Sequence, residues 1–282
     1  MENSEYKSAT CSCYKCPGAF GSRARNARLS LKITFKKITS FFTAILFFWT
    51  MTVSPVFAER IELQGGSVDV TVDGNKTNWD VTGNPIWEMP EFNLAESSIY
   101  NITGLTQNAS IAVLVNGGGV SSILGEMNLF NIAFILQNLA GIDIGASARI
   151  NLNNSALIAS TLPLDLSATD FLAGDYQFGY GKDFDDELSQ QGRLRNAGQI
   201  RGGKGDLVAL VGTAIENSGT IEVPMGTVAL AAGKTVAVGI SPDGMVTIGV
   251  DEATANQLGL KDQIRNSGTI SAKGGRVILN AK

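Results

Sequence analysis

The chain has 282 residues, of which 22 are basic, 26 are acidic and none is histidine. The lack of histidine removes the side chain most often used for acid–base catalysis and metal binding. Residues 1–58 hold 8 of the basic and 2 of the acidic side chains, so residues 59–282 have a net charge of −10. This negative charge argues against nucleic acid and anionic membranes as main partners.

The first 58 residues are predicted to be a signal peptide with an extended N-terminal region. Three lysines precede an apolar run at 41–53. That run is short for a membrane span, and the Val-Phe-Ala sequence ending at Ala58 is an acceptable cleavage site. We expect cleavage after Ala58 and one folded domain at 59–282. An uncleaved membrane anchor and a translation start downstream of Met1 are the alternatives.

All three cysteines, Cys11, Cys13 and Cys16, lie in this predicted signal segment. Their close spacing can suggest a metal site, but no histidine and no second ligand pair accompany them. We therefore predict no metal site and no cofactor. The processed domain would contain no cysteine and could use no disulfide bond in an oxidising compartment.

The folded part is expected to begin with strands. Residues 61–72 alternate apolar and polar side chains, which predicts one or two strands that cap the first exposed strand edge. Trp79 and Trp87 flank an Asn-Pro turn. We predict that both indoles pack in the core or cap, with a ligand platform as the alternative.

Glycines interrupt the apolar stretches between residues 101 and 145. The triple glycine at 117–119 lacks the Lys-Ser/Thr ending of a phosphate-binding loop, so we predict no nucleotide site there. The acidic patch of Asp183, Asp185, Asp186 and Glu187 lacks the glycine spacing of an EF-hand. It is predicted to be a solvated loop, with calcium binding or catalysis as alternatives.

A short phrase occurs three times in the second half of the chain: Asn196-Ala-Gly-Gln-Ile200, Asn217-Ser-Gly-Thr-Ile221 and Asn266-Ser-Gly-Thr-Ile270. Each copy precedes a glycine and an apolar run. Asn-x-Gly favours a tight corner, because both residue types tolerate positive φ. The corner residues are Asn196 and Gly198, Asn217 and Gly219, and Asn266 and Gly268.

Repeats of this length with a strand and a glycine turn are typical of a stacked solenoid. We predict an all-β, right-handed parallel β-helix with repeat coils from about 193, in which Val208 and Leu210 point inward. An ordinary antiparallel sheet is the alternative. The insert at about 234–262 contains two alternating segments around Ser-Pro-Asp-Gly. It is predicted to be a protruding β-hairpin followed by a short helix or loop.

Four segments between Glu91 and Thr161 occur in an order that resembles a known family. They are Glu91-Phe-Asn93, Gly118-Gly-Val-Ser-Ser-Ile-Leu-Gly125, Ile135-Leu-Gln-Asn-Leu-Ala-Gly-Ile142 and Ala156-Leu-Ile-Ala-Ser-Thr161. With the coils that follow, they resemble the N-terminal domain of filamentous haemagglutinin, the two-partner-secretion (TPS) or haemagglutination activity domain. The similarity covers residues 60 to 282.

One segment departs from the family pattern. The family's Asn-Pro-Asn-Gly-Ile is represented here by Asn138, Gly141 and Ile142, while the proline and the second asparagine are absent. In the family this motif is linked to a turn that supports secretion. The resemblance therefore implies that Asn138, Gly141 and Ile142, with Asn93 upstream, are secretion-motif residues.

The resemblance implies a function in export from a Gram-negative cell. Such a chain crosses the periplasm, is recognised by an outer-membrane β-barrel transporter with POTRA domains (TpsB-like), and folds at the cell surface or outside. It would belong to an adhesin- or haemagglutinin-like exoprotein that contacts host or neighbouring cells. We predict no catalytic residue.

Two other functions fit a β-helical chain. A polysaccharide-active enzyme needs clustered carboxylates on one face. An autotransporter passenger needs its own C-terminal membrane barrel. The chain ends at Lys282, directly after the apolar run of the third repeat, with no polar cap. We expect either truncation there or stacking on another chain.

Overall fold

The computed structural model describes residues 59–61, 66–165, 173–179, 192–240, 246–251 and 263–281. All of them belong to the second of two compact units, Val53–Lys282. The predicted signal peptide with its cleavage site at Ala58, the acidic patch at 183–187, the hairpin turn at 241–244 and the helix or loop after it fall outside these residues. Within them, no helix is long and apolar enough to cross a membrane.

Most of the strands form three sheets, called here A, B and C, with parallel neighbours throughout except at the first strand of sheets A and B. Sheet A contains β1 (Glu59–Ile61), β4 (Ile86–Met89), β6 (Ser110–Val115), β9 (Ala133–Asn138), β12 (Ala156–Ser160), β16 (Leu207–Gly212), β19 (Thr227–Ala232) and β24 (Arg276–Ala281). Sheet B contains β2 (Ser67–Asp73), β3 (Lys76–Thr82), β5 (Ile99–Gly104), β8 (Glu126–Phe130), β11 (Arg149–Asn153), β15 (Gln199–Arg201), β18 (Thr220–Glu222) and β23 (Thr269–Ser271). Sheet C contains β7 (Ser121–Ile123), β10 (Ile142–Ile144), β14 (Leu194–Asn196), β17 (Ile215–Asn217) and β22 (Ile264–Asn266).

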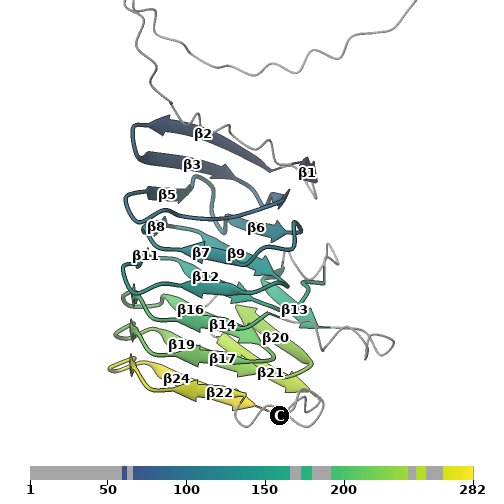
Figure 1. Ribbon diagram of the computed structural model, residues 1–282, viewed down its shortest axis with the longest axis vertical. Helices are drawn as coiled ribbons and strands as arrows, with labels where there is room; N and C mark the ends of the chain where they lie inside the picture. The colour runs from purple at the N-terminus through teal and green to yellow at the C-terminus, as the bar shows by residue number, and fades with distance from the viewer. Residues whose placement is uncertain are drawn as a thin grey trace, which may run out of the picture. The chain divides into compact units, whose positions relative to one another are not determined.

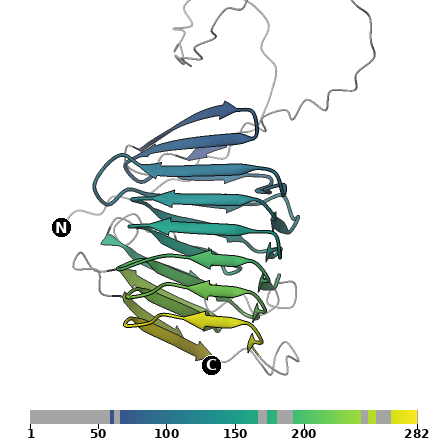
Figure 2. The ribbon, with the colours of Figure 1, turned by 90° about the vertical axis from the view of Figure 1, so that its left-hand side faces the viewer.

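From β7 onward the chain passes through the three sheets in a fixed order, C then B then A. We call each such set of three strands a rung. The rungs are β7–β8–β9, β10–β11–β12, β14–β15–β16, β17–β18–β19 and β22–β23–β24. Figures 1 and 2 show the strands of successive rungs one below another. The domain is therefore all-β with parallel sheets, an arrangement consistent with a β-helix.

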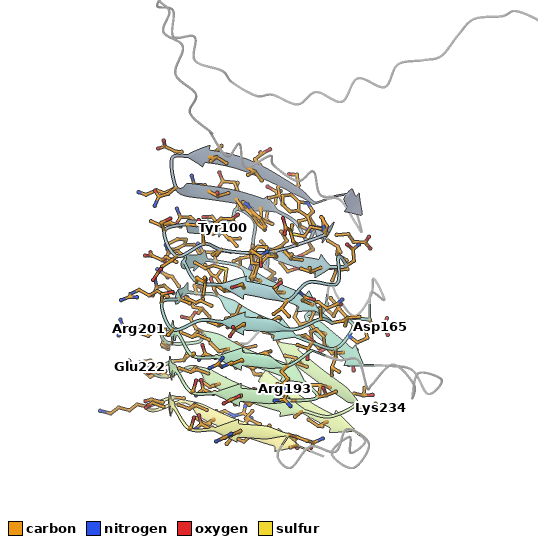
Figure 3. All side chains as sticks on the ribbon, in the orientation of Figure 1. Tyr100, Asp165, Arg193, Arg201, Glu222 and Lys234 are labelled. Atoms are coloured by element: carbon orange, nitrogen blue, oxygen red, sulfur yellow. The ribbon has the colours of Figure 1, made fainter. Side chains whose placement is uncertain are left out.

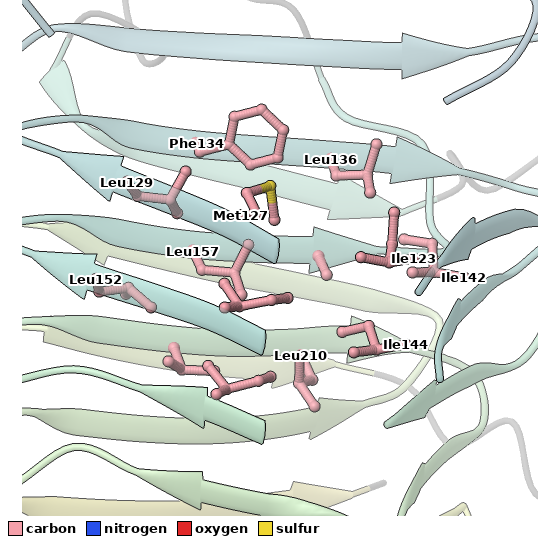
Figure 4. Packing of buried hydrophobic residues seen from close by; sticks show 14 of the residues in the cluster. Ile123, Met127, Leu129, Phe134, Leu136, Ile142, Ile144, Leu152, Leu157 and Leu210 are labelled. Atoms are coloured by element: carbon pink, nitrogen blue, oxygen red, sulfur yellow. The ribbon is translucent and has the colours of Figure 1, made fainter. Parts of the chain in front are cut away.

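Apolar side chains from all three sheets fill the space between them. In sheet B, Met127, Ile150, Ile200 and Ile221 occupy the same register position in successive strands. Figure 4 shows side chains of sheets A, B and C converging on one interior. Each fully buried Leu or Ile contributes roughly 1.5–3 kcal/mol to folding before its entropy loss is subtracted.

The two tryptophans of the N-terminal part pack as predicted. Trp79 is buried and its ring centroid lies 4.9 Å from that of Trp87. Trp79 also contacts Phe92 and Tyr100, at centroid distances of 6.0 and 5.8 Å. Burial raises the pKa of the Tyr100 hydroxyl, and a hydrogen bond with Thr77 lowers it by less. The predicted strands at 61–72 include β2, which pairs antiparallel with β3.

The central strands of sheet A are buried on both faces, so their sequences are continuous apolar runs rather than alternating ones. All six residues of β6, β16 and β19 are buried. Val208 and Leu210 point into the space between the sheets, as predicted. Leu207, Ala209 and Val211 belong to a second apolar cluster on the outer face.

A fourth sheet, sheet D, covers this outer face. It consists of β13 (Asp175–Gly179), β20 (Thr235–Ile240) and β21 (Val246–Asp251), all antiparallel. The pairing of β20 with β21 confirms the predicted hairpin strands. Their predicted protrusion is wrong, because Val236, Val238 and Val250 are buried in the second cluster. The buried face of the hairpin, which carries these valines, is stabilised by its contact with sheet A.

Candidate functional site

The four secretion-motif candidates gather around one short strand, β7. It is the end strand of sheet C, where unpaired backbone groups would otherwise be left open. Asn93 lies on the segment before it in the stack, and Asn138, Gly141 and Ile142 form the corner from β9 to β10. Because β10 pairs in parallel with β7, Ile142 lies opposite Ser121.

Asn138 is the last residue of β9 and is buried. Its Nδ2 donates to the carbonyl oxygen of Gly119 at 2.8 Å and to Ser121 Oγ at 2.9 Å. Its Oδ1 accepts from the backbone N–H of Ala140 at 2.9 Å, which closes an Asx turn. One side chain therefore both shapes its own corner and ties it to β7, the first strand of the same rung.

Gly141 completes this corner with φ of +130°, a conformation that L side chains rarely adopt. Its carbonyl oxygen accepts from the N–H of Ser121 at 3.0 Å, and the N–H of Ile142 donates to Arg193 O at 3.1 Å. A Cβ at Gly141 would lie 3.2 Å from the Arg193 carbonyl oxygen. The corner thus forms without the family's proline and second asparagine, whose places are taken by Leu139 and Ala140.

Asn93 holds the other edge of β7. Its exposed side chain accepts at Oδ1 from the backbone N–H of Ser122, 2.8 Å away. Beside it, the Leu94 N–H donates to Ser122 O at 2.9 Å, and Leu94 O accepts from the Leu124 N–H at 2.8 Å. The Asn93 amide oxygen therefore takes the place that a strand carbonyl would occupy, and it completes the hydrogen bonding at the edge of sheet C.

The repeated asparagines form a second polar arrangement, inside sheet C. Asn196, Asn217 and Asn266 are in register in β14, β17 and β22. Asn196 Nδ2 donates to Asn217 Oδ1, and Asn217 Nδ2 donates to Asn266 Oδ1, both at 2.7 Å. Asn196 and Asn217 are fully buried. The ladder links three rungs through side chains alone.

The reason predicted for the glycines after these asparagines is wrong. Gly198, Gly219 and Gly268 are not among the residues with positive φ. Space is the constraint instead, because a Cβ on Gly219 would overlap the carbonyl oxygen of Gly198, and one on Gly268 would overlap that of Gly219. Successive corners approach so closely that only hydrogen fits between them.

Sequence reasoning missed a third set of residues on the outer face of sheet B. Asn78, Asn101, Asn128 and Asn151 are joined from rung to rung by amide hydrogen bonds of 2.8–3.0 Å. Their separations of 23, 27 and 23 residues are a rung-length signal that could have identified them. The same column continues to Arg201 and Glu222, which lie near each other at one edge of the molecule in Figure 3.

These contacts orient the backbone at the corners and hold neighbouring rungs in register. Among the described residues, no group of three or more His, Cys, Asp or Glu side chains could hold a metal ion. The Asp206 carboxylate, for example, accepts from the N–H groups of Ser155 and Gly203 at 2.7 and 2.6 Å.

Comparison with known proteins gave a match among solved structures. No family model matches the chain, and no curated protein matches it. The chain is similar in structure to the HMW1 secretion domain from Haemophilus influenzae, with a TM-score of 0.66 and 28% sequence identity. The match covers 79% of this chain and 56% of that one. The chain thus spans little more than half of a solved secretion domain, and this similarity supports membership of the TPS domain family.

Proposed function

We propose that this chain is the TPS domain of a surface-exposed or secreted exoprotein. The observation that carries the proposal is the similarity in fold and sequence to a solved secretion domain. The order of segments from Asn93 to Ile142 also supports it, because those segments build the β7 edge and the corner from β9 to β10.

In this proposal the domain is a right-handed parallel β-helix. The constant order of sheets C, B and A along the chain supports a coiled path, since each rung pairs only with its neighbours. Folding can then nucleate in one region and spread from rung to rung. Such a domain suits a chain that must cross a membrane unfolded and fold on the far side.

The proposed partner is an outer-membrane β-barrel transporter with periplasmic POTRA domains, and the proposed destination is the cell surface or the medium. Recognition would depend on the corner at Asn138, Gly141 and Ile142 and on Asn93. All four act by holding β7 and its neighbours in place, so a change at any of them alters one continuous surface. The proposed role is binding and export, without catalysis.

A binding measurement tests this proposal. The purified chain 59–282 is titrated against the POTRA segment of a candidate TpsB-like transporter, with biolayer interferometry as the readout. We expect Gly141→Val to weaken binding at least tenfold, because valine is strained at φ +130° and strain of this kind costs about 1–3 kcal/mol. Gly119→Ala is the matched control, since its Cβ would meet nothing within 4 Å.

Two results would count against the proposal. If the unaltered chain does not bind the POTRA segment, transporter recognition is wrong. If Gly141→Val binds as tightly as Gly119→Ala while both melt like the parent, the corner has no part in recognition.

A further inference from the structure

Sheet D is assembled from two excursions that are far apart along the chain. β13 follows β12, whereas β20 and β21 follow β19. The register of β13 with β20 places Tyr176 opposite Val238 and Phe178 opposite Val236. Two complete rungs, β14–β15–β16 and β17–β18–β19, lie between the paired strands in sequence. Until β20 is available, β13 has only an isolated antiparallel bridge, between Phe178 and Leu164, and no ladder partner.

One face of sheet D is packed against the rungs. Tyr176 is 4% exposed and Phe178 1%, and Val236 and Val238 are fully buried. Their apolar cluster includes the outward side chains of sheet A, namely Ile135, Ile158, Ala209, Val211, Ala229 and Ala231. Figure 1 shows β13, β20 and β21 slanted relative to the strands of sheet A. An uncovered sheet A would present a broad apolar surface to water.

Sheet D is attached differently from the rungs. Each rung is bonded to the next through backbone hydrogen bonds in all three sheets, whereas the backbone ladders of sheet D join only β13, β20 and β21. Polar links from sheet D to sheet A include the Arg276 Nη1 donation to Val246 O at 3.0 Å and the hydrogen bond between Tyr176 and Ser110 of β6. Sheet D can therefore separate from sheet A without breaking the ladder of any rung.

We propose that β13, β20 and β21 form a latch, which closes over sheet A after the intervening rungs have stacked and opens as a unit while they persist. Stability that is distributed among neighbouring elements allows such local opening. The part of this inference that concerns export rests on the proposed function. During export, sheet D is separated from sheet A. Once the chain has left the transporter, sheet D packs on sheet A and stabilises the folded domain.

Hydrogen–deuterium exchange tests whether the latch is a separate unit. In the chain 59–282, we expect amides of β13, β20 and β21 to exchange together, at least tenfold faster than those of β12 and β16. Phe178→Ser should speed exchange in the latch and leave β12 and β16 unchanged. Gln177→Ser is the matched control, because Gln177 lies on the same strand but is only half-buried.

Two outcomes would overturn the latch. One is exchange of sheet D at the same rate as the rungs in the unaltered chain. The other is loss of protection in β12 and β16, or failure to fold, caused by Phe178→Ser alone, since the rungs would then depend on sheet D.

A cross-link tests the order of closure during export. The chain 59–282 has no cysteine, and Gln177 lies opposite Ala237 in the β13–β20 pair. The double variant Gln177→Cys, Ala237→Cys can therefore be oxidised in the periplasm and kept reduced with added dithiothreitol. We expect export of the reduced form and at least tenfold less of the oxidised form. The two single-cysteine variants are controls.

The outcomes separate the two proposals. If the unaltered chain is not exported by the transporter, the proposed function fails. If it is exported and the oxidised double variant is exported equally well, the latch does not have to be open in transit and the inference fails.

Discussion

Asn217 is fully buried and bonded on both sides, to Asn196 and to Asn266. A buried amide that loses its partner costs more than the hydrogen bond contributes, because the remaining group is still removed from water. The ladder is therefore most sensitive at its middle member. Asn266, by contrast, is exposed, and its Nδ2 makes only a long contact of 3.5 Å with Gly268 O.

Asn217→Ala is expected to lower the free energy of unfolding by about 1–3 kcal/mol, because it removes the acceptor of the fully buried Asn196 Nδ2 group. Asn266→Ala should cost clearly less, since that residue is exposed and ends the ladder. Urea unfolding followed by circular dichroism measures both. Equal losses in the two variants would show that the ladder does not stabilise the stack.

Tyr176 makes the latch sensitive to high pH. Burial is the main cause that raises the pKa of its hydroxyl to about 12, a hydrogen bond with Ser110 opposes the rise, and Asp175 adds to it. Below pH 10 the hydroxyl is neutral in both the folded and the unfolded chain, so its contribution to the free energy of unfolding is fully present. Between pH 10 and about 12 the hydroxyl ionises in the unfolded chain before it does so in the folded one. The free energy of unfolding therefore falls by up to about 3 kcal/mol across this range.

Tyr176→Phe should remove this part of the pH dependence between pH 10 and 12. The measurement is the free energy of unfolding of the parent and the variant at several pH values in that range. If the free energy of unfolding falls equally in the parent and the variant between pH 10 and 12, the hydroxyl is not buried as described.

Strands and corners show which features could be predicted from sequence. The Asn-x-Gly repeats predicted equivalent positions, and Asn196, Asn217 and Asn266 are indeed in register. Val208 and Leu210 were predicted to point inward because of their alternation, and they do. The packing of the hairpin on sheet A could not be predicted, because an apolar run such as β16 does not reveal what covers its second face.

The glycine corners show a different limit of sequence reading. Glycine is compatible both with positive φ and with close approach, and only the structure distinguishes the two. Gly141 has the positive φ, whereas Gly198, Gly219 and Gly268 have the close approach. The Asn93 side chain that replaces a strand carbonyl gave no local signal, because its partner Ser122 belongs to the next rung.

Gly219→Ala tests the close approach of neighbouring rungs. The added methyl group would overlap the backbone of the Gly198 corner, so we expect a loss of about 1–3 kcal/mol in the free energy of unfolding. Gly119→Ala, where the methyl group is unopposed, should change stability by less than about 0.5 kcal/mol. Chemical denaturation measures both. A Gly219→Ala variant as stable as the control would mean that the corners are further apart than described.

At the scale of the whole molecule, three kinds of contact act together. Backbone ladders join the rungs, asparagine ladders fix their register, and apolar clusters fill both sides of sheet A. The resemblance to a secretion domain, stated from the sequence, agrees with the similarity to the solved HMW1 secretion domain. The altered motif at Asn138 nevertheless forms its corner, because the Asx turn and Gly141 supply the geometry.

The most direct test of two-partner export is surface display of residues 1–282 in a Gram-negative host, with and without a candidate TpsB-like transporter. Protease accessibility of the domain on intact cells is the readout. We predict accessible protein only when the transporter is present, and a loss of at least tenfold for Gly141→Val but not for Gly119→Ala. Equal display without the transporter would contradict the proposed function.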